Sequence, residues 1–459
     1  MTGLTTGWVA ATMRRLGYEV HEGPDVPVTG GDADSRRIRA GQLFAAYPGD
    51  NTDGNLFVDA AFNAGAVAAI CSRAPERAWP DRTLVVAPDT TKAAGELGAA
   101  WRAACPGPRV VGITGTVGKT TAKEMTAAVL ASRFATHWTE GGLNSRQGLP
   151  LALLSLRPTH EVSVLEMGMD SKGEIAELCA MARPEVGVVL NIGLTHVARL
   201  GSVEAIQAEK LTLPRALPPT GTAVLNADDP RVAPVASELA CRVITFGTQN
   251  GGASVRYGPV EGHGLEGTRF SVSAGGERAR VDSPVPGVHT VPGVVAAICV
   301  AMALGMRLFE AAKAVASSGV TGRVRQLAGA NGSTIVDDRY NSSPASLAGA
   351  LEMLRGLRPR RFALLGKMAE LGEYEEQEHR TAGRLAAGCC DALFAVGDAC
   401  RPLVDEARAA GLAEAHWFPA KEEAAAAVRE LLRAGDTVLL KASRSQEFET
   451  LIPLLGGAA

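Results

Sequence analysis

The chain has 459 residues, of which 46% are hydrophobic and 21% are charged, and its formal net charge is −3. This length predicts about three domains, and the nearly neutral charge argues against nucleic acid or an anionic membrane as the main partner. The most apolar stretch, residues 294–306, is too short to cross a bilayer, and the N-terminus does not have the pattern of a signal peptide.

The eight cysteines are expected to be reduced and mostly buried, as in a cytoplasmic protein. None of them forms a C-x-x-C pair and most lie among apolar residues, which argues against metal ligands or disulfides. They are Cys71, Cys105, Cys179, Cys241, Cys299, Cys389, Cys390 and Cys400.

Residues 1–107 are predicted to form a small N-terminal α/β domain. The predicted helices cover residues 7–16, 57–65 and 91–104, and the predicted strands cover residues 66–72 and 83–88. The segment C-P-G-P-R at 105–109 interrupts the pattern and is typical of a linker.

Residues 108–321 alternate more regularly and are predicted to form a central domain. Near-continuous apolar strands separated by helices indicate a parallel sheet with both faces covered. The predicted strands cover 109–114, 161–168, 185–193, 222–226 and 241–247, and helices cover 171–182, 202–217, 293–305 and 308–317. The polar stretch 253–285 is interpreted as an antiparallel appendage.

A third alternation over residues 322–459 predicts a small doubly wound, Rossmann-like domain. Its predicted strands cover 333–338, 361–366, 391–397 and 436–443. The predicted fold class is therefore α/β, with a central parallel-sheet P-loop ATPase domain between a small N-terminal α/β domain and a C-terminal Rossmann-like domain.

The segment T-G-T-V-G-K-T-T at 114–121 predicts a loop that holds the phosphates of a nucleotide. Glycines let the backbone N–H groups approach phosphate oxygens, the lysine adds a point charge, and the first hydroxyl after it can bind Mg²⁺. The predicted nucleotide-binding residues here are Gly115, Thr116, Gly118, Lys119, Thr120 and Thr121. The loop alone leaves open whether the phosphate serves motion, a switch or activation.

Magnesium at such a loop also needs a carboxylate from a neighbouring strand end. Glu166 ends the predicted strand 161–168, and His196 follows the end of the next strand, so both are expected at one rim of the sheet. His196 taken alone fits a structural role as well as a metal ligand. Lys210, within a predicted helix, taken alone fits an ordinary surface lysine.

Several segments taken together resemble the Mur ligases. They are TGTVGKTT (114–121), GGLNSRQGLPL (141–151), VLEMGMDSKGEI (164–175), NIGLTHVARLGSVEAIQAEK (191–210) and LNADDPRV (225–232). Four more are similar to the family members that add D-alanyl-D-alanine to a UDP-muramoyl-tripeptide. These are DSRRIRAGQLFAAYPGDNTDG (34–54), GRVRQL (322–327), DDRYNSSPASL (337–347) and LLGKMAELG (364–372).

The resemblance implies an ATP-dependent carbon–nitrogen ligase of peptidoglycan synthesis, and so a link to cell shape and division. Its substrates would be a UDP-muramoyl-peptide and D-alanyl-D-alanine, joined through an acyl phosphate. It also implies two Mg²⁺ ions, one held by Thr120 and Glu166 and one by Glu166, His196 and a carbamate on Lys210. The family leads us to expect a monomer.

Further residue roles follow from the same resemblance. Catalysis is assigned to Lys119, Asn144, Glu166, His196 and Lys210. Arg323, Asp338 and Asn341 would complete the nucleotide site from the C-terminal domain. Ser35, Arg36, Asp53 and Gly54 would contact the UDP part of the substrate.

The sequence also departs from the family pattern at several positions. Thr290 and Gly293 replace the two asparagines expected near adenine, and Lys367 replaces an acidic residue. Smaller departures are Asn55, Thr212 and the segment Y-N-S-S-P at 340–344. They leave two alternatives open: a paralogue that joins another acid and amine, and an inactive nucleotide-binding partner protein.

Overall fold

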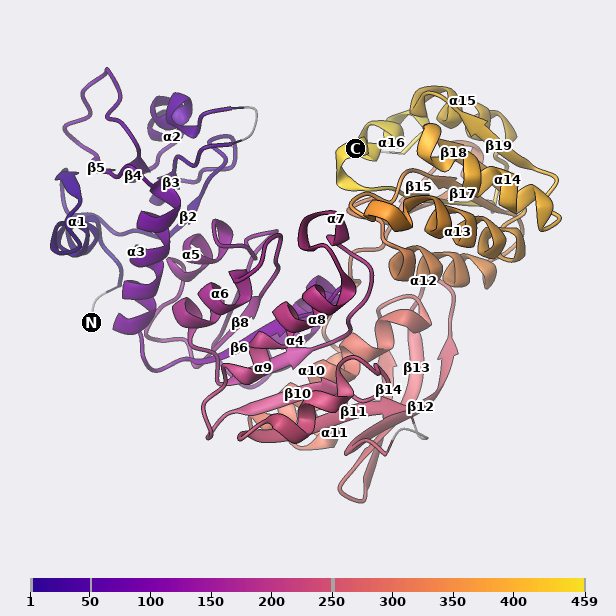
Figure 1. Cartoon of the computed structure of the whole chain (residues 1–459), viewed down its shortest axis with the longest axis horizontal. Helices are drawn as coiled ribbons and strands as arrows, with labels where there is room; N and C mark the ends of the chain where they lie inside the picture. Colours follow the sequence, from indigo (N-terminus) through magenta and orange to yellow (C-terminus); the bar gives the residue numbers. More distant parts are fainter. Residues whose placement is uncertain (1–2, 50–51, 249–251, 458–459) are drawn as a thin grey trace.

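Three β-sheets, each built from its own stretch of the chain, organise the structure, a computed structural model that describes residues 3–49, 52–248 and 252–457. The N-terminal and C-terminal units stand apart on the same side of the central unit (Figure 1). This arrangement confirms the predicted α/β class with a largely parallel central sheet between two smaller units. The predicted domain boundaries at 107/108 and 321/322 remain predictions.

The N-terminal sheet has the strand order β1-β5-β4-β3-β2, in which β1 is antiparallel to β5 and the other pairs are parallel. Its strands are β1 (Glu19–His21), β2 (Gly30–Asp32), β3 (Gln42–Ala45), β4 (Ala68–Cys71) and β5 (Thr83–Val86). The helices are α1 (Thr6–Arg15), α2 (Val58–Asn63) and α3 (Thr90–Ala104).

The central sheet has the order β14-β13-β12-β11-β10-β9-β6-β8-β7 and is parallel from β7 to β12. Its strands are β6 (Arg109–Thr114), β7 (Thr136–Trp138), β8 (Val162–Glu166), β9 (Val186–Val189), β10 (Thr222–Asn226), β11 (Arg242–Thr248), β12 (Val255–Gly262), β13 (Thr268–Ala274) and β14 (Glu277–Ser283). The predicted antiparallel appendage is therefore continuous with this sheet, because β12 pairs with β11.

Helices cover both faces of the central sheet, because its buried strands have apolar side chains on both sides. Val110 packs into one core with α5 and α6, whereas the neighbouring Val111 packs into another core with α4, α10 and α11. The helices are α4 (Lys119–Ala131), α5 (Gly148–Leu153), α6 (Glu174–Ala182), α7 (Val197–Leu200), α8 (Val203–Lys210), α9 (Thr212–Arg215), α10 (Val291–Ala303) and α11 (Leu308–Ala316).

The C-terminal sheet has the order β15-β16-β20-β17-β18-β19 and is parallel except between β15 and β16. Its strands are β15 (Arg325–Ala328), β16 (Thr334–Asp337), β17 (Arg361–Leu365), β18 (Ala392–Val396), β19 (Ala415–Phe418) and β20 (Thr437–Lys441). The helices are α12 (Pro344–Arg355), α13 (Glu375–Cys389), α14 (Arg401–Ala409), α15 (Lys421–Leu431) and α16 (Leu451–Leu454).

Short strands account for most differences from the sequence prediction. The strands that were not predicted are β1, β2, β3, β7, β15 and β19; each has only three or four residues, too few to carry a clear periodic signal. The predicted helix 202–217 is divided into α8 and α9 around Leu211, near Pro214, which lacks the N–H that a continuous helix needs.

The N-terminal unit is joined to the central unit by a shared apolar core. Leu97 and Trp101 of α3 belong to the same buried cluster as Leu149 and Leu153 of α5. The Trp101 indole N–H donates to the Leu156 carbonyl at 3.0 Å. This contact buries the indole completely and leaves its polar atom satisfied, so it fixes how α3 lies against the central unit.

Two further expectations can be compared with the described residues. All eight cysteines are free, and all but the partly exposed Cys241 are buried, as predicted. Within residues 3–49, 52–248 and 252–457, none of the helices has the length and apolarity needed to span a membrane.

Candidate active site

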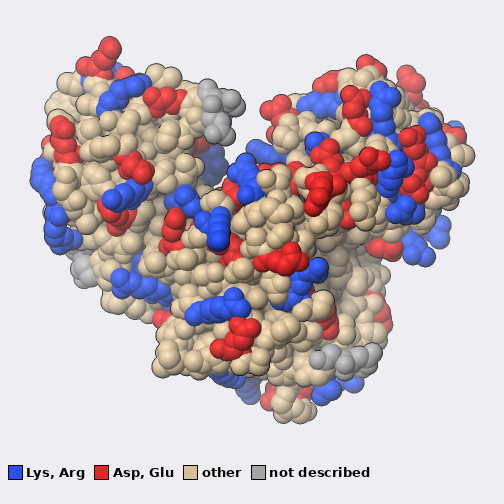
Figure 2. Space-filling view, viewed as in Figure 1, with Lys and Arg blue, Asp and Glu red and all other residues tan. Residues whose placement is uncertain are grey.

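A cavity of about 450 Å³ lies at the carboxyl ends of the central strands, where the C-terminal unit meets the central unit. Its central wall is formed by the loop after β6, the end of β8 and the loop after β9. Its opposite wall includes Arg323, Asp338 and Asn341. In the space-filling view the molecule is indented between the two outer units, and acidic and basic side chains are interspersed around this indentation (Figure 2).

The loop between β6 and α4 has the backbone that a phosphate site requires. Gly118 has φ of 82°, which a residue with a Cβ rarely adopts, and it is followed directly by the N-terminus of α4. The side chain of Asn191 accepts the Val117 N–H at 2.9 Å and donates to the Val117 carbonyl at 3.1 Å. The loop is therefore held in shape from the neighbouring strand end.

The ammonium group of Lys119 lies over this loop and donates to the carbonyls of Gly115 at 2.8 Å and Thr116 at 3.2 Å. Although part of the side chain faces the cavity, desolvation lowers the pKa of Lys119, Glu166 opposes this shift and Arg323 adds to it. A phosphate anion in the cavity would relieve this cost, because it would supply the missing opposite charge.

Glu166, at the end of β8, is 1% exposed and contacts two predicted site residues. Its Oε2 accepts the Thr120 hydroxyl at 2.8 Å, and its Oε1 accepts the Asn144 amide at 2.7 Å. A hydroxyl and a carboxylate that meet beside a phosphate loop are the protein ligands that Mg²⁺ prefers when phosphates and water supply the remaining ones. These residues therefore fit a magnesium ion.

Lys210 is not the surface lysine that its helix alone suggested. It is 1% exposed, and its ammonium group donates to the Gly115 carbonyl at 3.0 Å. Desolvation, with the nearby charge of Lys119, lowers the pKa of Lys210 well below its usual range. Burial thus favours a neutral amine beneath the phosphate loop, the form that can react with CO₂.

His196 also lines the cavity, from the residue before α7. Its Nδ1 lies 2.5 Å from Glu370 and 3.4 Å from Asp170. In the described part of the chain, no group of three His, Cys, Asp or Glu side chains is arranged to hold a metal. Glu166, His196 and Lys210 each face the cavity or its loop, but each contacts different groups.

The C-terminal unit adds a polar wall. Arg323 donates to the Thr120 hydroxyl, and its guanidinium lies 3.7 Å from the centre of the Tyr340 ring. The Asp338 carboxylate accepts from Lys441 at 2.6 Å, and the Asn341 carbonyl accepts from the same ammonium group at 3.1 Å. The three predicted residues of this unit therefore reach the same cavity as the phosphate loop.

Comparisons with known proteins agree with this geometry. Models of the Mur ligase catalytic, middle and glutamate ligase domains match residues 27–110, 113–301 and 322–444. The UDP-N-acetylmuramoyl-tripeptide–D-alanyl-D-alanine ligase of Bacillus subtilis is 32% identical over 91% of this chain and 91% of its own length. The chain belongs to the Mur ligase family. Members of this family are ATP-dependent ligases that form amide bonds, so the chain is an enzyme of this kind.

Other relatives extend the likeness across the whole Mur ligase chain. The corresponding ligase of Escherichia coli is 32% identical over 95% of both chains. The crystal structure of MurF from Acinetobacter baumannii superposes with a TM-score of 0.85 and 28% identity over 99% of both chains. MurF from Thermotoga maritima in complex with ADP has a TM-score of 0.77 and 27% identity over 93% of this chain and 97% of its own.

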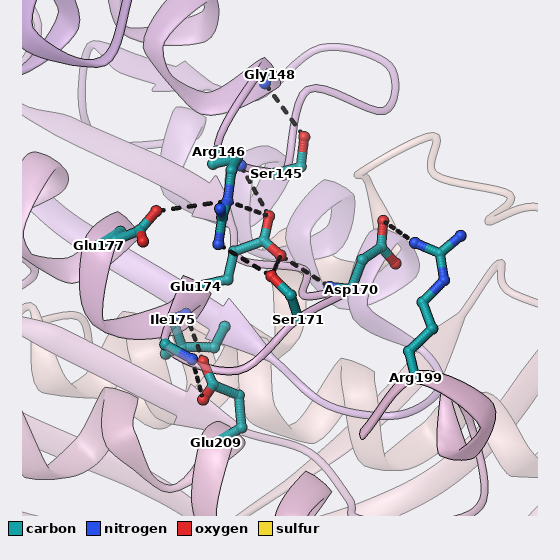
Figure 3. A network of polar contacts seen from close by, with 11 residues as sticks. Ser145, Arg146, Gly148, Asp170, Ser171, Glu174, Ile175, Glu177, Arg199 and Glu209 are labelled. Carbon is teal, nitrogen blue, oxygen red and sulfur yellow. Dashed lines mark hydrogen bonds and ion pairs between the residues drawn. The ribbon is translucent and has the colours of Figure 1, made fainter. Parts of the chain in front are cut away.

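Buried carboxylates hold the loops of this Mur ligase site in place (Figure 3). Glu174 accepts the backbone N–H groups of Arg146 at 3.0 Å and Asp170 at 2.8 Å. Glu209, next to Lys210, accepts those of Gly173 at 2.8 Å and Ile175 at 2.7 Å. The loop that carries Asn144 and the helix that carries Lys210 are thus both tied to the start of α6.

The four predicted UDP-binding residues lie in the N-terminal unit, outside the cavity lining. Arg36 is exposed and forms an ion pair with Asp34 at 2.7 Å. Asp53 accepts the Asn55 N–H at 2.9 Å, and Gly54 begins the short helix that follows. Ser35 is partly exposed in the turn before Arg36. Their role in substrate binding remains a prediction.

The larger departures from the Mur ligase pattern, Thr290, Gly293 and Lys367, lie at two places. Thr290 and Gly293 line the cavity; the Thr290 hydroxyl donates to the Gly287 carbonyl at 2.7 Å, and Gly293 lies close against Ala122 of α4. Lys367 forms an ion pair with Glu375 at 2.7 Å. An asparagine amide is therefore missing from the part of the cavity lined by α10.

Sequence reasoning missed three residues of the site. Asn191 holds the phosphate loop, Lys441 holds Asp338, and Tyr340 stacks on Arg323. Asn191 follows β9 and Lys441 ends β20, so the rule that ligands bind at the carboxyl ends of parallel strands could have identified these two residues. Tyr340 has no comparable signal, because its partner is distant in the sequence.

Proposed function

We propose that this chain uses ATP to join D-alanyl-D-alanine to a UDP-N-acetylmuramoyl-tripeptide in peptidoglycan precursor synthesis, in the cytoplasm. One observation carries the proposal: the phosphate loop, Glu166 and Arg323 border one cavity between two domains of a Mur ligase. The relatives from Bacillus subtilis and Escherichia coli that carry this name match more than nine-tenths of the chain.

The proposed chemistry explains why a phosphate site is needed. A carboxylate and an ammonium group form an ion pair in water and not an amide. Transfer of the γ-phosphoryl group of ATP to the acid gives an acyl phosphate, and the amine of the dipeptide then displaces phosphate through a tetrahedral intermediate. Lys119 and Arg323, two of the cations that line the cavity, would stabilise the charge developing on the transferred group.

The Thr120 hydroxyl and the Glu166 carboxylate, which meet beside the phosphate loop, support one magnesium position, and the family resemblance implies a second. Thr120 and Glu166 would hold one ion, and Glu166, His196 and the carbamate of Lys210 would hold the other. Bound Mg²⁺ supplies positive charge to phosphate and acyl oxygens. The carbamate forms when the neutral amine of Lys210 adds to CO₂ and releases a proton, and the burial and lowered pKa of Lys210 favour that amine.

The remaining residues position substrates. Asn144, which contacts Glu166, would lie beside the activated carboxyl group, and Asp338 and Asn341 would contact the nucleotide from the C-terminal domain. Ser35, Arg36, Asp53 and Gly54 would bind the UDP moiety. The family resemblance leads us to expect that the enzyme works as a monomer.

The test is an ADP-release assay with purified enzyme, Mg²⁺, ATP or GTP, and panels of acids and amines. We expect ADP release only when a UDP-muramoyl-tripeptide and D-alanyl-D-alanine are present together, and none with Lys119→Ala. Lack of dipeptide-dependent release with every UDP-muramoyl-tripeptide would exclude the proposal. Release with another acid and amine would identify a paralogue, the alternative suggested by Thr290 and Gly293.

A further inference from the structure

The loop that carries His196 is contacted by the C-terminal domain at a point away from the phosphate loop. Nδ1 of His196 lies 2.5 Å from Oε2 of Glu370, which precedes the short helix η5 (Gly372–Tyr374). The Ala198 N–H donates to the Glu370 carbonyl at 3.3 Å, and Nε of Arg199 lies 3.6 Å from Oε1 of Glu370. One residue of the C-terminal domain thus contacts three residues of the segment 196–199: His196, Ala198 and Arg199.

His196 and Glu370, the two residues that form the shortest of these contacts, both have an unusual backbone conformation. His196 has φ of 55° and Glu370 has φ of 63°, so each lies in the left-handed region, which costs a residue with a Cβ about 1–2 kcal/mol. Such conformations persist where surrounding contacts hold them, and they occur often at functional sites. Here they turn the imidazole and the carboxylate toward each other across the domain boundary.

A second carboxylate offers an internal comparison. Asp170, from the same domain as His196, lies 3.4 Å from the same Nδ1 and 3.9 Å from Arg199, and Figure 3 shows it directed at that arginine. The closer acid therefore comes from the other domain.

We propose that Glu370 is a positioning residue: it fixes the imidazole of His196 from the C-terminal domain, so that His196 becomes a competent metal ligand only when that domain has closed. The inference rests on the proposed function, in which His196 holds a divalent cation. Nδ1 of His196 is buried, with the Glu370 carboxylate as its nearest acid. If the carboxylate takes the N–H at Nδ1, Nε2 is left as the ligating nitrogen and its basicity increases. Domain closure and metal affinity then become one coupled equilibrium.

The test measures Mn²⁺ affinity by electron paramagnetic resonance, with a non-hydrolysable ATP analogue and without acid or dipeptide. Glu370→Gln keeps the shape but removes the charge, and we expect it to weaken Mn²⁺ binding about 10–100-fold. Glu373→Gln, at an exposed position of the same loop, is the matched control and should bind as the wild type does. Asp170→Asn should lose less affinity than Glu370→Gln.

A second variant and a second measurement guard against simple misfolding. Glu370→Asp keeps the charge and withdraws the carboxylate by one methylene, so its affinity should lie between those of the wild type and Glu370→Gln. Small-angle scattering with the analogue and Mn²⁺ should show a less compact particle for Glu370→Gln than for Glu373→Gln. Wild-type Mn²⁺ affinity in a folded Glu370→Gln, or a larger loss in Asp170→Asn, would overturn the inference.

Because the assay contains no acid or amine, its result is separate from the test of the proposed function. Failure of dipeptide-dependent ADP release together with weaker Mn²⁺ binding in Glu370→Gln would refute the substrates but support the role of Glu370. Dipeptide-dependent release with unchanged Mn²⁺ binding would refute the role of Glu370 alone.

Discussion

The two outer domains meet the central domain through contacts of opposite character. On the N-terminal side, Trp101 of α3 lies in one continuous buried cluster with residues of α5 and α6. On the C-terminal side, only partly buried residues such as Leu194, Leu265 and Tyr374 make apolar contacts. Polar contacts accompany them: Arg323 with Thr120 and His196 with Glu370 at the cavity, and Gln326 Nε2 with the Leu265 carbonyl at 2.7 Å.

This difference separates stability from function. Separating the N-terminal and central domains, whose interface we call the apolar joint, would expose a hydrophobic core to water. At the interface of the C-terminal and central domains, which we call the polar joint, each polar contact can be exchanged for contacts with water at a net cost of only about 0.5–1.5 kcal/mol. We therefore expect the N-terminal joint to stay closed and the C-terminal joint to open for nucleotide exchange. The candidate active-site cavity therefore lies at the polar joint, which requires less free energy to open.

The largest effect is expected at the apolar joint. Trp101→Ala removes a side chain that is 1% exposed and leaves the Leu156 carbonyl without its donor, so the free energy of unfolding should fall by about 3–5 kcal/mol. Chemical denaturation followed by circular dichroism measures it. The control is Trp138→Ala, at a side chain that is 41% exposed. A loss below about 1 kcal/mol for Trp101→Ala would contradict the comparison.

The next effect concerns activity at the polar joint. Arg323→Ala should lower kcat about 10²–10³-fold, because it removes a cation from the phosphate side of the cavity. Its free energy of unfolding should change by less than about 1 kcal/mol. Arg323→Lys should recover only part of the rate, since a lysine cannot stack on Tyr340 as a planar guanidinium does. A large loss of stability without loss of rate would reverse the comparison.

A pH effect of intermediate size is expected beside the apolar joint. His137 of β7 is buried and contacts Ser155 and Ser163, each at 2.8 Å, and burial lowers its pKa to about 3. Between pH 6.5 and 3 the unfolded chain binds a proton here that the folded chain does not. Stability should therefore fall as the pH falls, by about 2 kcal/mol from this residue at pH 5.

His137→Gln provides the control for this effect, because glutamine can hydrogen-bond but does not titrate. Thermal or urea unfolding between pH 7 and 5 should show a shallower loss of stability for His137→Gln than for the wild type. Equal slopes for the two proteins would mean that His137 does not resist protonation in the folded state.

The smallest effect tests whether stacking on Tyr340 positions Arg323 at the polar joint. Tyr340→Ala removes the ring on which Arg323 stacks, so kcat/KM should fall by an amount corresponding to about 0.5–2 kcal/mol, while Tyr340→Phe keeps the ring and should stay within about 0.5 kcal/mol of the wild type. Steady-state kinetics of ADP release measure both variants. Equal values for Tyr340→Ala and Tyr340→Phe would show that the stacking does not position Arg323.

The sequence predicted those features that depend on neighbouring residues. The strand Arg109–Thr114 and the strand Thr222–Asn226 lie where the apolar runs placed them, and the loop before Lys119 has the left-handed glycine that its pattern required. The short strands β7, β15 and β19 were missed. Each has only three or four residues, and apart from His137 and Ala415 their side chains are partly or fully exposed. Pairing with neighbouring strands, and not their own periodicity, therefore makes them strands.

The sequence alone determined the alternation of strands and helices, the phosphate loop and the family resemblance. Each of these features depends on short runs of residues with a fixed period or spacing. Only the tertiary structure decided that Lys210 is buried under the Gly115 carbonyl and that Glu370 reaches His196. Those contacts join residues far apart in the chain, and their existence depends on how whole helices and domains pack. A pattern along the sequence carries no such information.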